Sequence, residues 1–235
     1  MTRLAATVLL DLDGTLSDNY VGIAASIRHA LAALGVADVA DAELRGCVGP
    51  PLRHSFARLL DTAEVPRIEQ ALALYRDRYR DVGWRENVLY EGVPAALAAL
   101  ARVGCTLYLC TSKPQPFAER IVAHFGLGSV LAGVYGADLA GTYDDKKLLM
   151  RHLIATEGLD SGSSIMVGDR YHDMHAAAAN GLPAIGVLWG YGSREELTGS
   201  GAAYLVDAPA GLLPAVARVL GRGDAPATPT AADAR

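Results

Sequence analysis

The chain has 235 residues, of which 51% are hydrophobic and 20% are charged, and its formal net charge is −5 at pH 7. This composition supplies enough apolar side chains for a buried core, and the negative charge without any basic block argues against nucleic acid or a membrane surface as a partner. No stretch approaches the roughly 18 apolar residues that a membrane-spanning helix needs, and the apolar segment near the N-terminus is too short for a secretory signal. We therefore expect a cytoplasmic protein, either a monomer or a homodimer.

Short apolar segments alternate with longer helical patterns along most of the chain, which favours a parallel β-sheet covered by helices. The segments are apolar almost throughout, as expected for strands that are buried on both faces. The expected strands are residues 4–10, 105–110, 130–135, 164–167 and 184–188, and the expected helices are residues 94–103, 116–125, 146–157 and 172–180. The predicted fold class is therefore α/β, with a doubly wound, Rossmann-like parallel sheet.

One region interrupts this alternation, because residues 16–87 show only helical periodicity. The apolar residues that recur there at spacings of three and four are Ile23, Ile27, Leu31 and Leu34, followed by Tyr75, Tyr79 and Val82. The region directly follows the first strand, where a simple βαβ unit would carry one helix. We interpret residues 16–87 as an inserted all-helical subdomain and residues 1–15 and 88–220 as the α/β core. Residues 221–235 have almost no large apolar side chains and are predicted to be disordered.

The first strand runs directly into two carboxylates, in the segment Asp11-Leu12-Asp13-Gly14-Thr15. In open α/β sheets ligands bind at the carboxyl ends of the strands, so Asp11 and Asp13 lie where a site is expected. Gly14 allows the chain to turn and its backbone to approach a ligand closely. Taken alone, this pattern is also compatible with an ordinary acidic loop after a strand.

Polar residues at other strand ends favour the functional interpretation. The second strand ends in Thr111-Ser112-Lys113, a later strand ends in Gly168-Asp169 with Asp173 close behind, and Lys146 opens a helix between them. Carboxylates from two strand ends suit Mg²⁺, which usually binds one or two protein carboxylates together with a substrate phosphate. A lysine and a hydroxyl group would complete the binding of a phosphoryl group.

With these residues in this order, the sequence resembles the haloacid dehalogenase superfamily. Asp11 to Thr15 match its first motif, Thr111 the second, Lys146 the third, and Gly168-Asp169 with Asp173 the fourth. The resemblance covers nearly the whole chain except the tail, and the position of the helical insertion is similar to that of members with an α-helical cap. Further stretches resemble a phosphoglycolate phosphatase-like or 5′-nucleotidase-like group. They are Val48 to Leu52, Thr111 to Pro114, Gly168 to Asp173 and Gly186 to Gly192.

The resemblance implies a Mg²⁺-dependent hydrolysis of a small phosphate ester. Asp11 would attack phosphorus and form an aspartyl-phosphate, and Asp13 would protonate the leaving alkoxide and then activate water. Asp11, Asp169 and the backbone carbonyl of Asp13 would hold Mg²⁺, and Asp173 would orient a metal-bound water. Thr111 and Lys146 would bind the transferred phosphoryl group.

Several alternatives stay open at this level. Dehalogenases typically lack the second aspartate, so Asp13 favours a phosphatase or a sugar-phosphate mutase. Phosphoglycolate is a plausible substrate, and a nucleoside 5′-monophosphate is the main rival; a non-enzymatic binding module is the least favoured reading. The phosphate-binding lysine could be Lys147, because the third motif often reads Lys-Pro and no proline follows Lys146 here.

The substrate-binding residues are expected to be Gly14, Thr15, Ser112, Lys113 and Arg53. Arg53 follows a rigid turn and could pair with a substrate anion, but a solvated surface position is equally compatible. Asn19 could line the site or cap the helix that follows it. The segment Gly190-Tyr191-Gly192 is only a weak indication of a phosphate-binding loop.

Overall fold

The computed structural model describes residues 4–138 and 141–221. The tail predicted to be disordered lies almost entirely outside the described residues. Within them, the chain forms a six-stranded sheet of order β5-β4-β1-β6-β7-β8 in which every neighbouring pair is parallel. Strands β4 and β5 are added on one side of β1, and the chain then crosses back to add β6, β7 and β8 on the other side. The predicted doubly wound α/β class is confirmed.

The central strands are short and apolar, as the sequence predicts. The strands of the sheet are β1 (Thr7–Leu10), β4 (Thr106–Pro114), β5 (Gly133–Ala137), β6 (Ser164–Gly168), β7 (Ala184–Val187) and β8 (Tyr204–Val206). Along β1, Val8 and Leu10 face one layer of helices and Leu9 faces the other, because successive side chains of a strand point to opposite faces. Both faces are therefore buried.

Helices cover the two faces of the sheet. One layer contains α5 (Val93–Arg102), α6 (Gln115–His124) and α10 (Leu212–Val219), and the other contains α7 (Lys146–Glu157), α8 (Tyr171–Ala179) and α9 (Arg194–Gly199). Short 3₁₀ turns, η2 (Leu127–Ser129), η3 (Ser161–Ser163) and η4 (Pro209–Gly211), precede strands or a helix. Among the described residues, no helix is both long and apolar enough to span a lipid bilayer.

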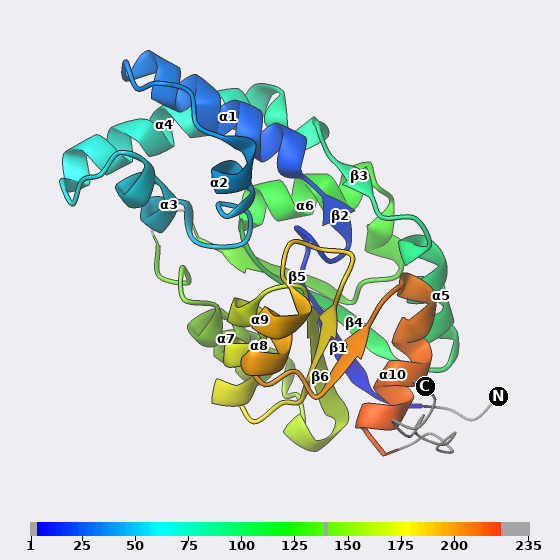
Figure 1. The fold of residues 1–235 in the computed structure, drawn as a ribbon. Coiled ribbons are helices and arrows are strands. Elements are labelled where there is room, and N and C mark those ends of the chain that lie inside the picture. The colour runs from blue at the N-terminus through cyan, green and yellow to red at the C-terminus, as the bar shows by residue number, and fades with distance from the viewer. Residues whose placement is uncertain (1–3, 139–140, 222–235) are drawn as a thin grey trace, which may run out of the picture.

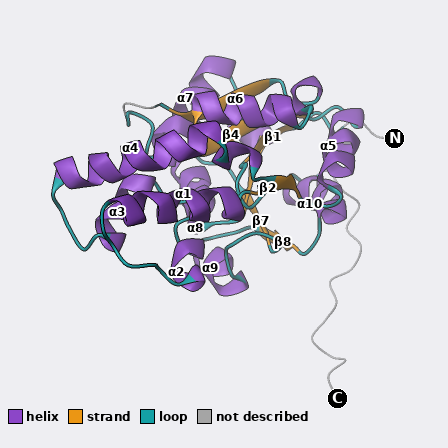
Figure 2. Ribbon diagram, turned by 90° about the horizontal axis from the view of Figure 1, so that it is seen from above, coloured by secondary structure: helices purple, strands orange, loops and turns teal. Residues whose placement is uncertain are grey.

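The chain between β1 and β4 forms a separate group of helices, which we call the helical unit. It consists of α1 (Tyr20–Ala33), α2 (Asp41–Arg45), α3 (Leu52–Leu59), α4 (Val65–Asp81) and the 3₁₀ turn η1 (Gly83–Arg85). These helices lie together at one end of the molecule (Figure 1), and they meet α6, whose Phe117 packs edge-on against Tyr79 of α4. Seen from above, α1, α3 and α4 lie side by side (Figure 2). They enclose their own apolar cluster, which includes the predicted positions Ile23, Ile27, Leu31, Tyr75 and Tyr79.

Two features of the helical region differ from the sequence prediction. Residues 16–87 are not helical throughout, because β2 (Ser17–Asp18) pairs antiparallel with β3 (Val88–Leu89) where the chain enters and leaves the helical unit. A strand of two residues is too short for an alternation of apolar and polar side chains to be recognised in the sequence. Val82, which the periodicity assigned to the buried face, follows the end of α4 and is 45% exposed.

The core also contains elements that the sequence analysis did not expect. Strand β8 and the helices α9 and α10 were missed, because the apolar positions of these short elements lie close to loops rich in glycine and alanine. Strand β4 continues to Pro114, four residues beyond the expected end, so the polar segment Thr111-Ser112-Lys113 belongs to the strand itself.

Candidate active site

The register of the sheet brings three strand ends to one point. The last residue of β1 pairs with Leu109 of β4 on one side and with Val167 of β6 on the other. Asp11 follows directly, and its backbone N–H donates a hydrogen bond to the carbonyl oxygen of Val167 at 3.0 Å. The polar residues that come next on the neighbouring strands are Thr111 and Asp169. The site therefore forms at the carboxyl edge of the sheet, where the doubly wound topology changes direction.

Three carboxylates and one ammonium group gather at this edge. Oxygens of Asp11, Asp169 and Asp173 lie within 4.8 Å of one another. The Nζ atom of Lys146 is 2.8 Å from Asp11 Oδ1 and 2.5 Å from Asp173 Oδ1. All four side chains are buried. Burial alone would lower the pKa of Lys146, but Asp11 and Asp173 outweigh it and raise that pKa, so the ammonium group stays charged.

This cluster has the charge and the ligand type of a magnesium site. Burial, followed by the nearby charges of Asp173 and Asp11, raises the pKa of Asp169 well above its usual range. When all three carboxylates are ionised, one lysine cannot balance them, and the excess negative charge is shielded from water. A divalent cation with a preference for oxygen ligands would neutralise that excess. Asp11, Asp169 and Asp173 therefore fit Mg²⁺ by their ligand type and their mutual distances.

The loop after β7 holds Asp169 in place, a contribution that the sequence analysis did not identify. The backbone N–H of Tyr191 donates to Asp169 Oδ2 at 2.8 Å. A Cβ atom on Gly190 would lie 2.3 Å from Asp169 Cβ, and one on Gly14 would lie 2.1 Å from Asp169 Oδ2, so both positions lack space for a side chain. Gly14 also has a φ of +87°, which favours glycine. The sequence of this loop is a weak indication of a phosphate-binding loop, but in the structure the backbone amide of Tyr191 binds the carboxylate of Asp169.

Two of the predicted substrate-binding residues, Gly14 and Thr15, contact Asp169 in the structure. The Thr15 hydroxyl group donates to Asp169 Oδ1 at 3.1 Å, and its side chain is fully buried. Gly14 packs against the same carboxylate. In the structure, these residues of the first motif therefore support the carboxylate cluster rather than line the pocket beside it.

The side chain of Asp13 is part of a second cluster, separate from the carboxylates of Asp11, Asp169 and Asp173. Lys113 Nζ lies 2.7 Å from Asp13 Oδ2, and Asn19 Nδ2 donates to Asp13 Oδ1 at 3.1 Å. The hydroxyl oxygen of Tyr79 accepts hydrogen bonds from both Asn19 and Lys113, at 2.6 and 3.0 Å. Asn19 is the N-cap residue of α1 by position, but its side chain makes no capping hydrogen bond and contacts Asp13 and Tyr79 instead.

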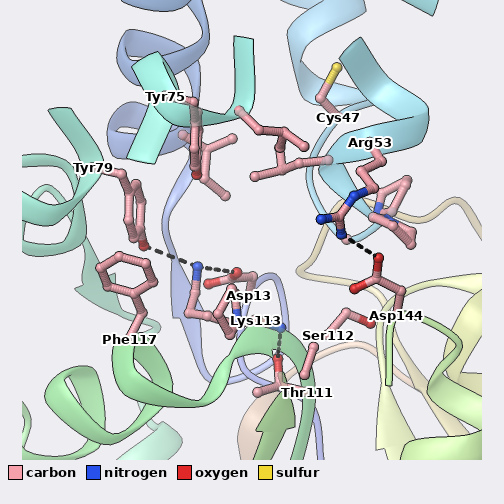
Figure 3. Close-up of a pocket in the computed structure, with 18 of the residues that line it drawn as sticks. Asp13, Cys47, Arg53, Tyr75, Tyr79, Thr111, Ser112, Lys113, Phe117 and Asp144 are labelled. Atoms are coloured by element: carbon pink, nitrogen blue, oxygen red, sulfur yellow. Dashed lines mark hydrogen bonds and ion pairs between the residues drawn. The ribbon is translucent and has the colours of Figure 1, made fainter. Parts of the chain in front are cut away.

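A pocket lies between the strand ends and the helical unit. Figure 3 shows Tyr75 and Tyr79 on one side of it and Arg53 with Asp144 on the other. Its floor includes Asp11, Asp13, Thr111, Ser112 and Lys113, and its upper wall includes Ile23, Leu72, Tyr75, Tyr79, Pro50 and Pro51. The site thus combines buried acidic groups with a largely apolar wall, as is usual for small-molecule pockets.

Arg53 lines this pocket, but its charge is already compensated. Its guanidinium group lies 2.7 Å from Glu69 Oε1 and 2.8 Å from Asp144 Oδ2. Asp144 belongs to the core and Arg53 to the helical unit, so this ion pair joins the two. Arg76 also lines the pocket, and within the described part of the chain it forms no ion pair.

The two candidate lysines are placed very differently, and this leads to a prediction. Lys146 is buried against Asp11, whereas Lys147 is exposed on the same helix. We expect Lys146→Met to lower kcat/KM by roughly 10²- to 10³-fold, as the loss of one electrostatic stabiliser usually does. Lys147→Met is the matched control and is expected to stay within about twofold of wild type, because an exposed side chain of this kind contributes little.

Initial-rate measurements on both lysine variants would check this prediction. Removing the Lys146 charge leaves buried carboxylates uncompensated, so circular dichroism must first show that the variant is folded at the assay temperature. A large loss in Lys147→Met with normal activity in Lys146→Met would reverse the assignment.

Comparisons with known proteins identify the class of this chain. A model of the haloacid dehalogenase-like hydrolase family matches residues 8–187. The chain belongs to this family. A solved structure described as a predicted phosphatase from Clostridium acetobutylicum superposes with a TM-score of 0.87, with 34% identity over 91% of this chain and 99% of that one.

Curated relatives narrow the class to phosphoryl-group chemistry. A 5′-nucleotidase of Pseudomonas aeruginosa is 43% identical over 81% of this chain and 86% of its own length. A phosphoglycolate phosphatase of Cupriavidus necator is 33% identical over 88% of this chain and 93% of its own. The tyrosine-protein kinase PtkA of Mycobacterium tuberculosis is 39% identical over 80% of this chain, but only over 64% of its own length. With the family match, these similarities make this chain an enzyme, a phosphatase of the haloacid dehalogenase superfamily.

Proposed function

We propose that this enzyme hydrolyses a small phosphate monoester through an aspartyl-phosphate on Asp11, with Mg²⁺ bound by Asp11, Asp169 and Asp173. One observation carries the proposal: the buried carboxylates of Asp11, Asp169 and Asp173 and the ammonium group of Lys146 lie together at the carboxyl edge of the sheet, where Asp11 also lines the pocket. Bound Mg²⁺ would offset the charge of the phosphate and of the nucleophile, which otherwise repel each other.

The side chains of this site suit a two-step reaction. In the first step an Asp11 oxygen attacks phosphorus, the bond from phosphorus to the ester oxygen breaks, and Asp13 gives that oxygen a proton. In the second step water attacks the aspartyl-phosphate, Asp13 takes a proton from the water, and the bond from Asp11 to phosphorus breaks. Lys146 and Thr111 would bind the equatorial oxygens, where charge is concentrated during transfer.

The pocket wall supports a nucleoside 5′-monophosphate as the substrate. Tyr75 and Tyr79 stack with ring centroids 5.3 Å apart, and Phe117 meets Tyr79 edge-on at 5.0 Å. All three line the pocket, together with aliphatic side chains of the helical unit. A planar, partly apolar base gains more from such a wall than a two-carbon acid does. The 43% identical relative named a 5′-nucleotidase supports the same choice.

Phosphoglycolate is the second candidate, because one cation of the pocket is available to its carboxylate. Arg53 and Lys113 are both paired with acidic side chains, whereas Arg76 is not paired within the described residues. Arginine binds carboxylates through two parallel hydrogen bonds. If phosphoglycolate is the substrate, Arg76→Met should lower its kcat/KM by more than about tenfold.

A phosphate-release assay over nucleoside 5′-monophosphates, phosphoglycolate and sugar phosphates, with Mg²⁺ and with chelator, tests the proposal. We expect Mg²⁺-dependent release, with nucleotides the best substrates and little effect of Arg76→Met on them. A higher kcat/KM for phosphoglycolate would select the second candidate. A requirement for a sugar bisphosphate, with no net release, would indicate a mutase. No hydrolysis of any ester would contradict the proposal as a whole.

A further inference from the structure

Tyr79 is a residue of the helical unit that reaches into the core beside Asp13. It lies in α4, near the end of the unit, and its side chain is buried. Its hydroxyl oxygen is the common acceptor of Asn19 Nδ2 and Lys113 Nζ. The same two nitrogen atoms bind the two different oxygens of Asp13. Four side chains thus close a ring, Asp13-Asn19-Tyr79-Lys113, and Figure 3 shows the Tyr79 and Asp13 contacts of Lys113.

We propose that Tyr79 is a positioning residue for the proton transfers of Asp13, and that it acts by holding Asn19 and Lys113 against the two carboxylate oxygens. This inference rests on the role proposed above for Asp13. It assigns a defined task to a side chain of the helical unit, which otherwise contributes only wall residues to the pocket.

The ring geometry explains why the hydroxyl group matters. A carboxylate bound at one oxygen can rotate, whereas one held at both oxygens keeps the orientation that proton transfer requires. The Lys113 side chain is long and has three donors, so it needs a second acceptor to fix its ammonium group. Tyr79 supplies that acceptor to Lys113 and also to Asn19. Because the acceptor comes from α4, the ring is complete only while the helical unit lies over the core.

Tyr79→Phe tests the proposal, because it removes only the hydroxyl group. The aromatic side chain at position 79 keeps its stacking with Tyr75 and its edge contact with Phe117, so we expect the fold to be retained. The informative quantity is kcat/KM, which reports the steps up to release of the leaving alcohol. An alkoxide needs a proton from Asp13 as it leaves, whereas p-nitrophenolate is a weak base and leaves without one.

The effect of Tyr79→Phe should therefore depend on the leaving group. For an alkyl ester such as AMP we expect kcat/KM to fall roughly 10- to 100-fold, part of the 10²–10⁴ that general acid–base catalysis supplies. For p-nitrophenyl phosphate we expect a change of no more than about threefold. Equal losses on both esters would mean that Tyr79 has a merely structural role, and no loss on either would also overturn the proposal.

Tyr20→Phe is the matched control. Tyr20 is a residue of the helical unit that does not line the pocket, and its hydroxyl group donates to the backbone carbonyl oxygen of Asp41 at 3.3 Å. Tyr20→Phe therefore removes a hydroxyl group from the helical unit but none from the ring of Asp13, Asn19, Tyr79 and Lys113. We expect the ratio of kcat/KM between the two esters to stay within about twofold of the wild-type ratio, since no member of that ring loses a partner.

A double-mutant cycle separates this inference from the function on which it rests. If Tyr79 acts through Asp13, then Tyr79→Phe should lose its leaving-group dependence when Asp13→Ala is already present. A Tyr79→Phe effect that persists unchanged in that background would contradict the inference alone. Normal hydrolysis of AMP by Asp13→Ala would contradict the role of Asp13 itself, and with it the proposed mechanism.

Discussion

Asp11→Asn is expected to abolish turnover while the protein stays folded. Asparagine has almost the same shape, and its side-chain oxygen can still accept from Lys146, which lies 2.8 Å from Asp11 Oδ1. The amide cannot act as a nucleophile toward phosphorus, so kcat should fall by at least ~10⁴-fold, as losses of a covalent nucleophile do. Phosphate release from AMP or phosphoglycolate with Mg²⁺ measures this effect.

Trapping of the intermediate would show whether the loss has the expected cause. Acid quenching of the wild-type enzyme during turnover of ³²P-labelled substrate should leave label on the protein, and Asp11→Asn should carry none. Asp207→Asn is a suitable control, because the Asp207 side chain is 80% exposed and, among the described residues, pairs only with the exposed Arg194. Activity near wild type in Asp11→Asn would rule out Asp11 as the nucleophile.

Asp169→Asn is expected to remove Mg²⁺ binding without destabilising the metal-free protein. Burial and two acidic neighbours raise the pKa of Asp169. For an acid with a raised pKa, the folded state loses stability as pH increases from the unfolded value of about 4 through the folded value. At neutral pH the buried carboxyl group of Asp169 therefore destabilises the metal-free wild type. The amide of asparagine cannot ionise and can keep the hydrogen bond from Tyr191.

Thermal unfolding and isothermal titration calorimetry with Mg²⁺ measure both effects. Saturating metal, at about 100 times its Kd, should stabilise the wild type by about 2.7 kcal/mol. For a domain of this size that corresponds to an increase in Tm of roughly 5–10 °C. Asp169→Asn should show no such increase, no heat of binding and little activity, and its metal-free Tm should equal or exceed that of the wild type. An unchanged metal titration would exclude Asp169 from the site.

The sequence predicted five of the six strands of the sheet, four of the six helices that flank it, and the edge of the sheet at which the polar residues gather. Apolar segments such as Val8 to Leu10 can be recognised because a strand buried on both faces has no polar positions. Asp11, Thr111 and Asp169 follow such segments, and parallel strands place their carboxyl ends together. These three residues therefore come together because they follow parallel strands, and the strands themselves can be predicted from local sequence patterns.

The tertiary structure alone decided which side chains complete the site. Lys146 and Lys147 are adjacent in sequence, but helix geometry turns one toward Asp11 and the other to solvent. Local patterns could not assign Asn19 and Tyr79 to Asp13, because their distance from it depends on how the helical unit packs on the core. The Tyr191 amide contacts Asp169 across 22 positions of the chain. Such contacts depend on how whole helices and strands pack against one another. The spacing of apolar residues within one element does not reveal which other element it will contact.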